Sequence, residues 1–527
     1  MPMSALMRVR TSLRAGALLA LAAVSVVASV AAGDEFQDRV NAPFKQYAQD
    51  RRSDTILLPL LAKLTDPPSA ASPALQAALL PSEAAAFAGA SEWSQSESSA
   101  AFFEGLKKVT GEKDWKRAFG FAQPYGVGGV EPEIIAARAY TDLGDPPLLG
   151  RAKHLYLPML DRAECLVHVE ATRLQSAGQP DKALELLWRW AHFSRSMCDR
   201  AFFAEVTWGL KATTLAIERM RDVAYVDSRL EKPLLTAEYI VREVITDRLK
   251  DRSGILEVDR ITFPEGNRIA AEQLIATVFK RRGDADTAIY AKILGEVTAK
   301  GRAMRLFSET ARWDSLSKLA GNQLETSEKL GHVQGDWVLR WKLPPLDPLH
   351  RLRSDFQKMD KVRFAIIQLI VGDMGPLFEQ RHRLQIELNG TRMALAMQAY
   401  YLGQQNYPRT LGSVAPAYAP KLDPDPFSAA KPPRDFWFFV PVRDAVRDPI
   451  NPVTKHDVTV FPANNFPSFT KSLDASHFVI YSVGPDGAQQ GCSRATQMVE
   501  DDKGDYLIWP PVMSLVRENL VTTGALK

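Results

Sequence analysis

The chain has 527 residues, of which 46% are hydrophobic and 24% are charged, and this composition is typical of a globular protein with more than one domain. Its formal net charge is +3, which Arg8, Arg10 and Arg14 account for, so the remaining chain is neutral and has no global attraction for nucleic acid or an anionic membrane. Three cysteines exclude a disulfide scaffold and a four-cysteine zinc site, and the sequence contains no Walker, dinucleotide-binding, zinc-protease or serine-hydrolase motif.

The first 32 residues have the pattern of a secretory signal. A basic start is followed by an apolar run from Ala15 to Ala32, and small residues end the run before the polar segment that begins at Gly33. We expect cleavage here, which makes the mature protein periplasmic or extracellular. The alternative is an uncleaved N-terminal anchor, because about eighteen apolar residues just span a bilayer. No later segment is long enough, so we expect no stable membrane span after cleavage.

Helices are predicted through most of the chain up to residue 380. Residues 33–150 form an alanine- and proline-rich region with helices expected over 55–63 and 98–108. In the helical domain, 151–380, two amphipathic stripes are separated by Gly178-Gln179-Pro180, which predicts a helical hairpin. The sequence AGQPDKALELLWRW at this point resembles the helix start of a tetratricopeptide-type repeat, without a second copy at that period. Further helices are expected over 236–249, 270–281, 285–300, 315–329 and 361–369.

The composition changes after Gln405. Residues 408–467 contain twelve prolines, a density that excludes a long helix. Short aromatic and β-branched runs at 435–442, 457–461 and 477–483 predict strands. The fold class is therefore expected to be a mainly α body followed by a small C-terminal α+β module.

An ordered set of motifs in this module resembles a known family. A helix over 385–402 is followed by Asn406-Tyr407-Pro408, Pro424-Asp425-Pro426-Phe427, Tyr481–Gly487 and Gly504–Pro510. This order resembles the globular domain of type II secretion major pseudopilins over about residues 385–511, and also the ending of exported, uncharacterised bacterial helical proteins. The resemblance implies an antiparallel sheet and leaves 512–527 as a C-terminal tail.

The resemblance also implies a calcium site. In pseudopilins the loop after the Asp-Gly turn binds calcium, and this role falls here on Asp486 and Asp505, with Asp501, Asp502 and backbone oxygens available to complete the shell. Calcium needs six to eight oxygen ligands. The loop of this chain is longer than the family's and contains a cysteine and two basic residues, so a plain turn with solvated acids is the alternative.

A second group of titratable residues lies in the predicted hairpin. Glu164 and His168 are four residues apart on one helical face, and His154 precedes them. Such a pair can begin a metal site or an acid–base site, but a site needs three or four converging ligands. A surface ion pair is the simpler interpretation.

The three cysteines are expected to be thiols. In the predicted hairpin, Cys165 and Cys198 are offset by roughly 8 Å along the helix axis, beyond comfortable disulfide reach, so both are expected to be buried and unpaired. Cys492, near the turn, is expected to be exposed, and a thiol enzyme would need a partner such as His477.

No catalytic residues and no cofactor-binding residues are predicted, apart from the calcium set. We interpret the chain as an exported, non-enzymatic envelope protein, in which the helical body binds another envelope protein and the pseudopilin-like module is an interaction head. The alternative function is a periplasmic hydrolase with a site in the cleft of the helical domain, formed by His154, Glu164 and His168. A purely structural protein is a third interpretation. Nucleic acid is not an expected partner.

Overall fold

A computed structural model describes residues 35–112, 117–249, 254–299, 302–445, 453–462, 466–496 and 504–526. The predicted signal segment, 1–32, and the candidate calcium ligands Asp501 and Asp502 lie outside these ranges. None of the described helices combines the length and the apolar character that crossing a membrane requires.

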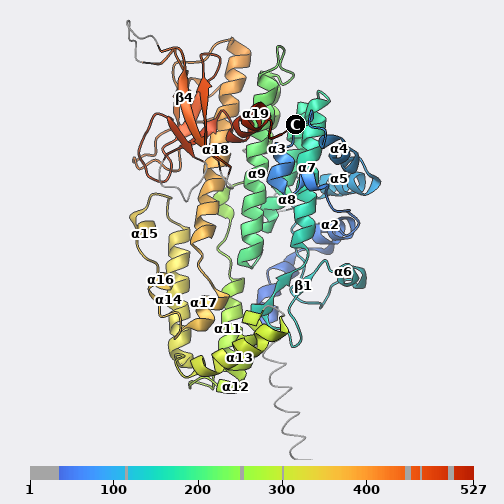
Figure 1. The fold of residues 1–527 in the computed structure, drawn as a ribbon, viewed down its shortest axis with the longest axis vertical. Coiled ribbons are helices and arrows are strands. Elements are labelled where there is room, and N and C mark those ends of the chain that lie inside the picture. The colour runs from blue at the N-terminus through green and yellow to red at the C-terminus, as the bar shows by residue number, and fades with distance from the viewer. Residues whose placement is uncertain are drawn as a thin grey trace, which may run out of the picture.

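The described chain is mainly helical, with strands in its C-terminal region, as predicted (Figure 1). The N-terminal helices are α2 (Ser53–Leu61), α3 (Ala74–Leu79), α4 (Phe87–Ser94), α5 (Glu97–Val109) and α6 (Pro132–Ala136). They are followed by α7 (Leu157–Ser176), α8 (Pro180–Met197), α9 (Phe203–Ser228), α10 (Ala237–Tyr239), α11 (Gly266–Val278), α12 (Thr287–Ala299), α13 (Ala303–Ser317), α14 (Gln323–Trp341), α15 (Pro348–Arg351), α16 (Asp355–Lys358), α17 (Ala365–Ile370), α18 (Gly375–Gln404) and α19 (Val512–Thr522). A π-helical segment, η5 (Ile240–Leu249), continues α10, and short 3-10 turns are η1 (Phe44–Gln46), η2 (Gln49–Arg51), η3 (Ser69–Ala71), η4 (Leu149–Arg151), η6 (Val258–Arg260) and η7 (Leu411–Val414).

The predicted hairpin is formed by α7 and α8. Gly178 follows α7 with φ of +71°, a left-handed conformation that glycine adopts without steric cost. Pro180 occupies the first turn of α8, where its missing N–H removes no helical hydrogen bond. The same three residues therefore end one helix and begin the next, as the sequence indicated.

Two long helices, α9 and α18, pack against each other at the centre of the molecule (Figure 1). The predicted short amphipathic helix over 385–402 is wrong in both respects, because α18 has 30 residues and is buried on all sides. An amphipathic helix would turn its polar residues to solvent, but Glu387 and Thr391 are fully buried in the core. Helix α9 lies in the region expected to be mostly helical but was not predicted as a separate helix, and most of its residues are buried.

The single helix predicted over 315–329 is divided into α13 and α14. Asn322 caps the start of α14 by accepting a hydrogen bond from the N–H of Glu325, and the Glu325 carboxylate accepts one from the N–H of Asn322. This reciprocal capping box fixes a helix start in the middle of the predicted segment.

The C-terminal strands form a six-stranded sheet. They are β3 (Trp437–Phe439), β4 (His456–Phe461), β5 (Phe469–Leu473), β6 (Val479–Ser482), β7 (Arg494–Thr496) and β8 (Asp505–Trp509), in the order β3-β6-β8-β7-β4-β5. The sheet is mixed rather than antiparallel, because β7 runs parallel to both neighbours, β4 and β8. The antiparallel sheet was an expectation from the pseudopilin resemblance, and the apolar alternation of the strands could not correct it, because alternation carries no information on strand direction. A separate two-stranded ladder joins β1 (Thr141–Asp142) to β2 (Lys153–His154), in and beside a region predicted to be helical.

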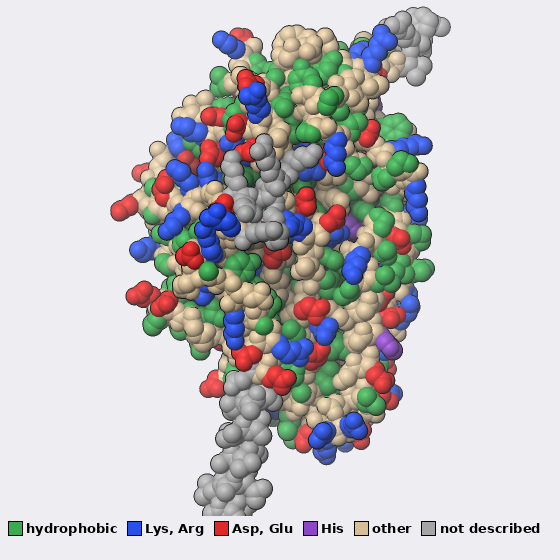
Figure 2. Space-filling model, turned by 180° about the vertical axis from the view of Figure 1, so that it is seen from behind, with side chains coloured by type: hydrophobic (Ala, Val, Ile, Leu, Met, Phe, Trp, Pro, Cys, Tyr) green, Lys and Arg blue, Asp and Glu red, His purple; other side chains and the backbone are tan. Residues whose placement is uncertain are grey.

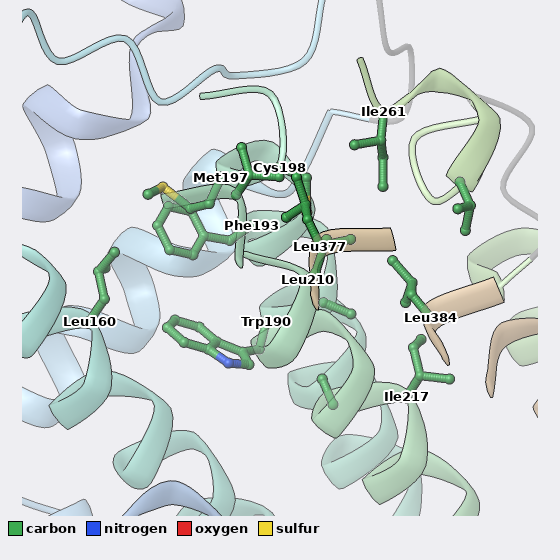
Figure 3. Packing of buried hydrophobic residues seen from close by; sticks show 14 of the residues in the cluster. Leu160, Trp190, Phe193, Met197, Cys198, Leu210, Ile217, Ile261, Leu377 and Leu384 are labelled. Atoms are coloured by element: carbon green, nitrogen blue, oxygen red, sulfur yellow. The ribbon is translucent and has the colours of Figure 1, made fainter. Parts of the chain in front are cut away.

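The central strands of the sheet, β6 and β8, are buried on both faces, whereas β4 and β5 keep exposed residues on one face. Alternate residues of β6 enter two different hydrophobic clusters. Phe478 and Ile480 join the main core, part of which Figure 3 shows between α7, α8, α9 and α18. Val479 and Tyr481 join a second cluster with α3 and α19. Gly390 on α18 allows β8 to approach closely, since a Cβ there would lie 2.5 Å from Ile508 Cδ1.

Buried charges also connect the body to its C-terminal part. Arg221 on α9 donates to Glu387 on α18 at 2.5 Å, and the Tyr506 hydroxyl of β8 donates to the same carboxylate at 2.7 Å. All three side chains are fully buried. At the next residue of α9, Arg517 of α19 donates twice to Asp222, at 2.9 and 2.8 Å. The last helix and the last strand are thus held by charge-assisted hydrogen bonds to the central helices.

Candidate functional site

The structure brings the two described calcium candidates, Asp486 and Asp505, to one turn. The carboxylate of Asp505 accepts hydrogen bonds from the N–H of Cys492 at 2.6 Å and of Gln490 at 3.2 Å. The carboxylate of Asp486 accepts from the N–H of Ala488 at 2.8 Å and from the side-chain amide of Gln490 at 2.9 Å. Gln490 therefore links the two acids.

A third acid lies close to this turn. Asp425, from the Pro424–Phe427 motif, accepts a hydrogen bond from the Ser482 hydroxyl at 2.8 Å. Burial raises the pKa of Asp425 to about 6, and the charge of Asp505 contributes to the shift. Burial likewise raises the pKa of Asp505 to about 6, with a contribution from Asp486. The turn thus gathers carboxyls whose charges oppose one another, and Asp425 was not predicted to belong to it.

The described residues do not complete a calcium shell. Asp486 and Asp505 supply carboxylate oxygens that already accept N–H hydrogen bonds, and the remaining acidic candidates, Asp501 and Asp502, lie outside the described ranges. Within those ranges, no cluster of three or more His, Cys, Asp or Glu side chains is arranged to hold a metal ion. Since calcium takes six to eight oxygens, further ligands would have to come from backbone carbonyls, water and residues 501–502.

Cys492 is buried, so the prediction of an exposed thiol is wrong. It is fully enclosed in the cluster that contains Val458 and Tyr481, and burial raises the pKa of its thiol well above the ordinary value. His477 contacts Asp474 at 3.0 Å instead. The polar neighbours of Cys492 in sequence suggested exposure, but the turn directs its side chain inward under the sheet.

The second predicted group, His154, Glu164 and His168, occupies three different surroundings. His154 lies 3.7 Å from Glu205, and burial lowers its pKa. His168 is fully buried near Arg219, and burial lowers its pKa to about 3, which keeps its ring neutral. Glu164 lines a pocket.

That pocket, here called the Glu164 pocket, lies between α3, α7 and the segment that follows α19. Figure 1 shows these elements together beside the C-terminal end of the chain. The pocket has a volume of about 1150 Å³. Its walls are largely apolar, and the larger apolar side chains are Leu75, Leu79, Pro158, Phe466, Leu520 and Leu526.

The charged groups of the Glu164 pocket are mostly acidic. Asp66, Asp161 and Glu164 line it together with one base, Arg162, which lies 3.4 Å from Asp66. Burial raises the pKa of Glu164 to about 8, and the charge of Asp161 adds to the shift. Asp161 accepts a hydrogen bond from the Trp208 indole at 2.8 Å. The raised pKa keeps Glu164 protonated at neutral pH, so its carboxyl can donate a hydrogen bond, or ionise when a cation lies beside it.

The two thiols of the hairpin are free and buried, as predicted. Burial raises the pKa of both Cys165 and Cys198 to about 12. The thiolate is the reactive form, so Cys165 is a poor nucleophile although it borders the Glu164 pocket.

No family model, curated protein or solved structure matches this chain. The candidate sites are therefore defined by the geometry of the chain's own residues. Of the predicted residues, Asp486 and Asp505 are brought together and Glu164 lines a pocket. The walls of that pocket were not predicted, because they come from segments far apart in the sequence.

Proposed function

We propose that this chain is an exported, non-enzymatic envelope protein whose helical body binds an apolar segment of another envelope protein in the Glu164 pocket. The observation that carries the proposal is an apolar pocket of about 1150 Å³ with a buried carboxyl at its wall. Binding sites are typically apolar hollows with a few well-placed polar groups. The secretory pattern of residues 1–32 supports the location in the envelope.

The charged residues of the Glu164 pocket indicate which partner segment it would bind. Three acids and one base favour an apolar stretch that carries a lysine, an arginine or an amino group. In this proposal the α7–α8 hairpin acts as a tetratricopeptide-like pair of helices, and the module over 385–511 acts as a pseudopilin-like head. The packing of β6 supports a rigid head, because Ile480 lies in the main core and Val479 and Tyr481 lie in the second cluster, so both faces of this strand are held.

The first prediction concerns charge selectivity in the pocket. Two fluorescent peptides with the same apolar sequence, one ending in lysine and one in glutamate, are titrated into purified residues 33–527. The lysine peptide is expected to bind about tenfold more tightly, since a difference of about 1.4 kcal/mol is modest for a charge in a half-buried site. Glu164→Gln is expected to reduce this preference, and Leu75→Arg, which fills the pocket, to weaken both peptides.

The matched control for Leu75→Arg is Leu324→Arg, at an exposed position on α14. It should leave both affinities unchanged. Equal binding of the two peptides, or unchanged binding to the Leu75→Arg variant with a native circular dichroism spectrum, would contradict the proposal.

The second prediction is that calcium stabilises the pseudopilin-like head, residues 385–511. We propose that a calcium ion neutralises Asp486 and Asp505, a role that the pseudopilin resemblance implies and that their shared hydrogen bonds to Gln490 support. Calcium is expected to raise the melting temperature saturably, and Asp486→Ala to remove the rise. Magnesium at the same concentration is the control. A wild-type melting temperature that does not respond to calcium would reduce the turn to a structural feature.

A hydrolase is the second candidate function, and one observation favours it. Glu164 and Asp161 are neighbouring carboxyls in a pocket, and the raised pKa of Glu164 makes it a proton donor at neutral pH. Hydrolysis of nitrophenyl esters or glycosides that Glu164→Gln abolishes would support this function. Binding of peptides without turnover would support the first.

A further inference from the structure

Helix α13 exposes two large apolar side chains to solvent. Met304 is 90% exposed and Phe307 is 84% exposed, the highest values among the large hydrophobic residues of the described ranges. They lie three residues apart and therefore on one face of the helix. Such exposure costs free energy unless another surface covers these side chains.

The opposite face of α13 is the one that packs against the protein. Trp313 is buried against α12, where its indole donates to the Thr298 hydroxyl at 3.0 Å. Gly295 of α12 faces Thr310 of α13 so closely that a Cβ at Gly295 would lie 2.5 Å from its hydroxyl. The hairpin of α12 and α13 is thus well packed inside, and the face with Met304 and Phe307 is turned away from the body.

Basic residues border this face. Residues 302–318 contain four bases and two acids; the bases are Arg302, Arg305, Arg312 and Lys318, and the acids are Glu309 and Asp314. The Glu309 carboxylate lies 3.8 Å from Nε of Arg305 and 3.6 Å from Nη1 of Arg312. One negative charge is therefore shared between two guanidinium groups. The helix keeps a net positive charge, although the mature chain as a whole is neutral. Over the whole face of the molecule that Figure 2 shows, basic and acidic side chains are interspersed, in keeping with the neutral balance of the chain beyond residue 32.

The N-terminal end of the described chain lies next to this hairpin. Arg39 pairs with Glu272 of α11 at 2.7 Å, and α11 packs against α12. Figure 1 shows α11, α12 and α13 together at the end of the molecule opposite α19.

We propose that α13 docks the protein on an anionic membrane surface, with Met304 and Phe307 inserted among the lipid headgroups and the basic residues facing lipid phosphates. An amphipathic helix with aromatic and basic residues binds membranes in this way. A second protein copy fits less well, because two exposed side chains supply roughly 300 Å², whereas a stable protein interface buries about 1,200 Å² or more. The proposal is independent of the Glu164 pocket, which lies at the other end of the molecule.

The test is cosedimentation of residues 33–527 with vesicles. This chain retains every described contact and lacks the apolar run, which would itself insert into lipid. We expect binding to vesicles of phosphatidylglycerol and phosphatidylethanolamine that weakens with salt, and little binding to neutral phosphatidylcholine. The double variant Met304→Ser/Phe307→Ser is expected to lose about tenfold in affinity, because the apolar area that enters the membrane is removed. Both positions are exposed, so the variant should keep the native circular dichroism spectrum.

Leu324→Ser is the matched control, because Leu324 is an exposed leucine on α14 outside this face, and its binding should equal that of the wild type. Equal vesicle binding by the double variant would overturn the proposal, as would binding that does not distinguish anionic from neutral lipid. A dimer that the double variant abolishes, measured by light scattering without vesicle binding, would assign the face to a second copy and also overturn it.

Discussion

Glu387→Gln is expected to lower the free energy of unfolding by about 3–5 kcal/mol, the range observed when one partner of a buried ion pair is removed. Glutamine keeps the volume but leaves the guanidinium of Arg221 without its carboxylate, in a position that water does not reach. The hydrogen bond that Tyr506 donates to Glu387 also loses its charged acceptor. Urea denaturation followed by circular dichroism and by tryptophan fluorescence measures the change.

The matched control is Glu238→Gln, which removes an exposed ion pair between neighbouring helical turns, with Arg242. It is expected to cause no measurable change, because exposed pairs contribute little. Both spectroscopic probes should shift together for Glu387→Gln, since Arg221, Glu387 and Tyr506 belong to α9, α18 and β8. Equal effects of the two substitutions, or loss of the sheet signal alone, would contradict this account of how the two parts are joined.

The second large effect is expected at Glu205, a fully buried carboxylate. It accepts hydrogen bonds from the hydroxyls of Tyr125 and Tyr156, from Arg200 at 2.8 Å and from the N–H of Phe202 at 3.2 Å. Burial alone would raise its pKa, but Arg200, His154 and the two tyrosines together lower it to about 2. Glu205→Gln removes the charge that these donors surround, and a loss of about 3–5 kcal/mol is expected.

The lowered pKa of Glu205 also predicts a pH dependence. The folded protein binds this proton less readily than the unfolded chain, whose pKa is near 4.5, so the stabilisation is complete above pH 4.5. It is lost as the pH falls from 4.5 to about 2, and it amounts to about 3 kcal/mol. Denaturation curves from pH 6 to pH 2 should therefore show a steeper loss of stability for the wild type than for Glu205→Gln.

Glu164 provides a control of opposite sign. Burial raises its pKa to about 8, so its contribution favours the folded state at low pH and is lost as the pH rises from 4.5 to 8. Glu164→Gln should accordingly be more stable than the wild type at pH 8. If the free energy of unfolding of Glu205→Gln and of Glu164→Gln depended on pH as it does in the wild type, the shifted pKa values of both carboxyls would be contradicted.

The helices that could be predicted are those with one apolar face. The α7–α8 hairpin was predicted because its stripes and its Gly178–Pro180 boundary are both visible in the sequence. Helix α9 was not predicted as a separate helix because most of its residues are buried. Its buried charged residues, such as Arg221 and Asp222, interrupt the apolar pattern by which a core helix is recognised in a sequence. Sequence patterns detect a contrast between two faces, and a helix enclosed on all sides does not present one.

The candidate sites were only partly predictable for a similar reason. Asp486 and Asp505 could be paired because a motif resemblance placed both on one turn. Asp425 comes close to them only because it accepts a hydrogen bond from Ser482 of β6, a contact that depends on the folded sheet. Glu164 was noticed for its spacing from His168, yet its surroundings are set by α3 and by residues beyond 519. Contacts between segments so far apart depend on tertiary packing, which local periodicity does not encode.

The packing of α3 against α19 has a consequence for the order in which the protein is made. Arg517 donates to the backbone carbonyl of Ala78, a contact between residues 439 positions apart. A ribosome releases α3 long before it has synthesised α19, so the nascent chain waits for most of its synthesis without this partner. The second hydrophobic cluster, which includes Ala78 and Leu79, stays incomplete during that time. The contacts between α3 and α19 therefore form late, and the N-terminal part of this cluster stays accessible to chaperones until α19 has been synthesised.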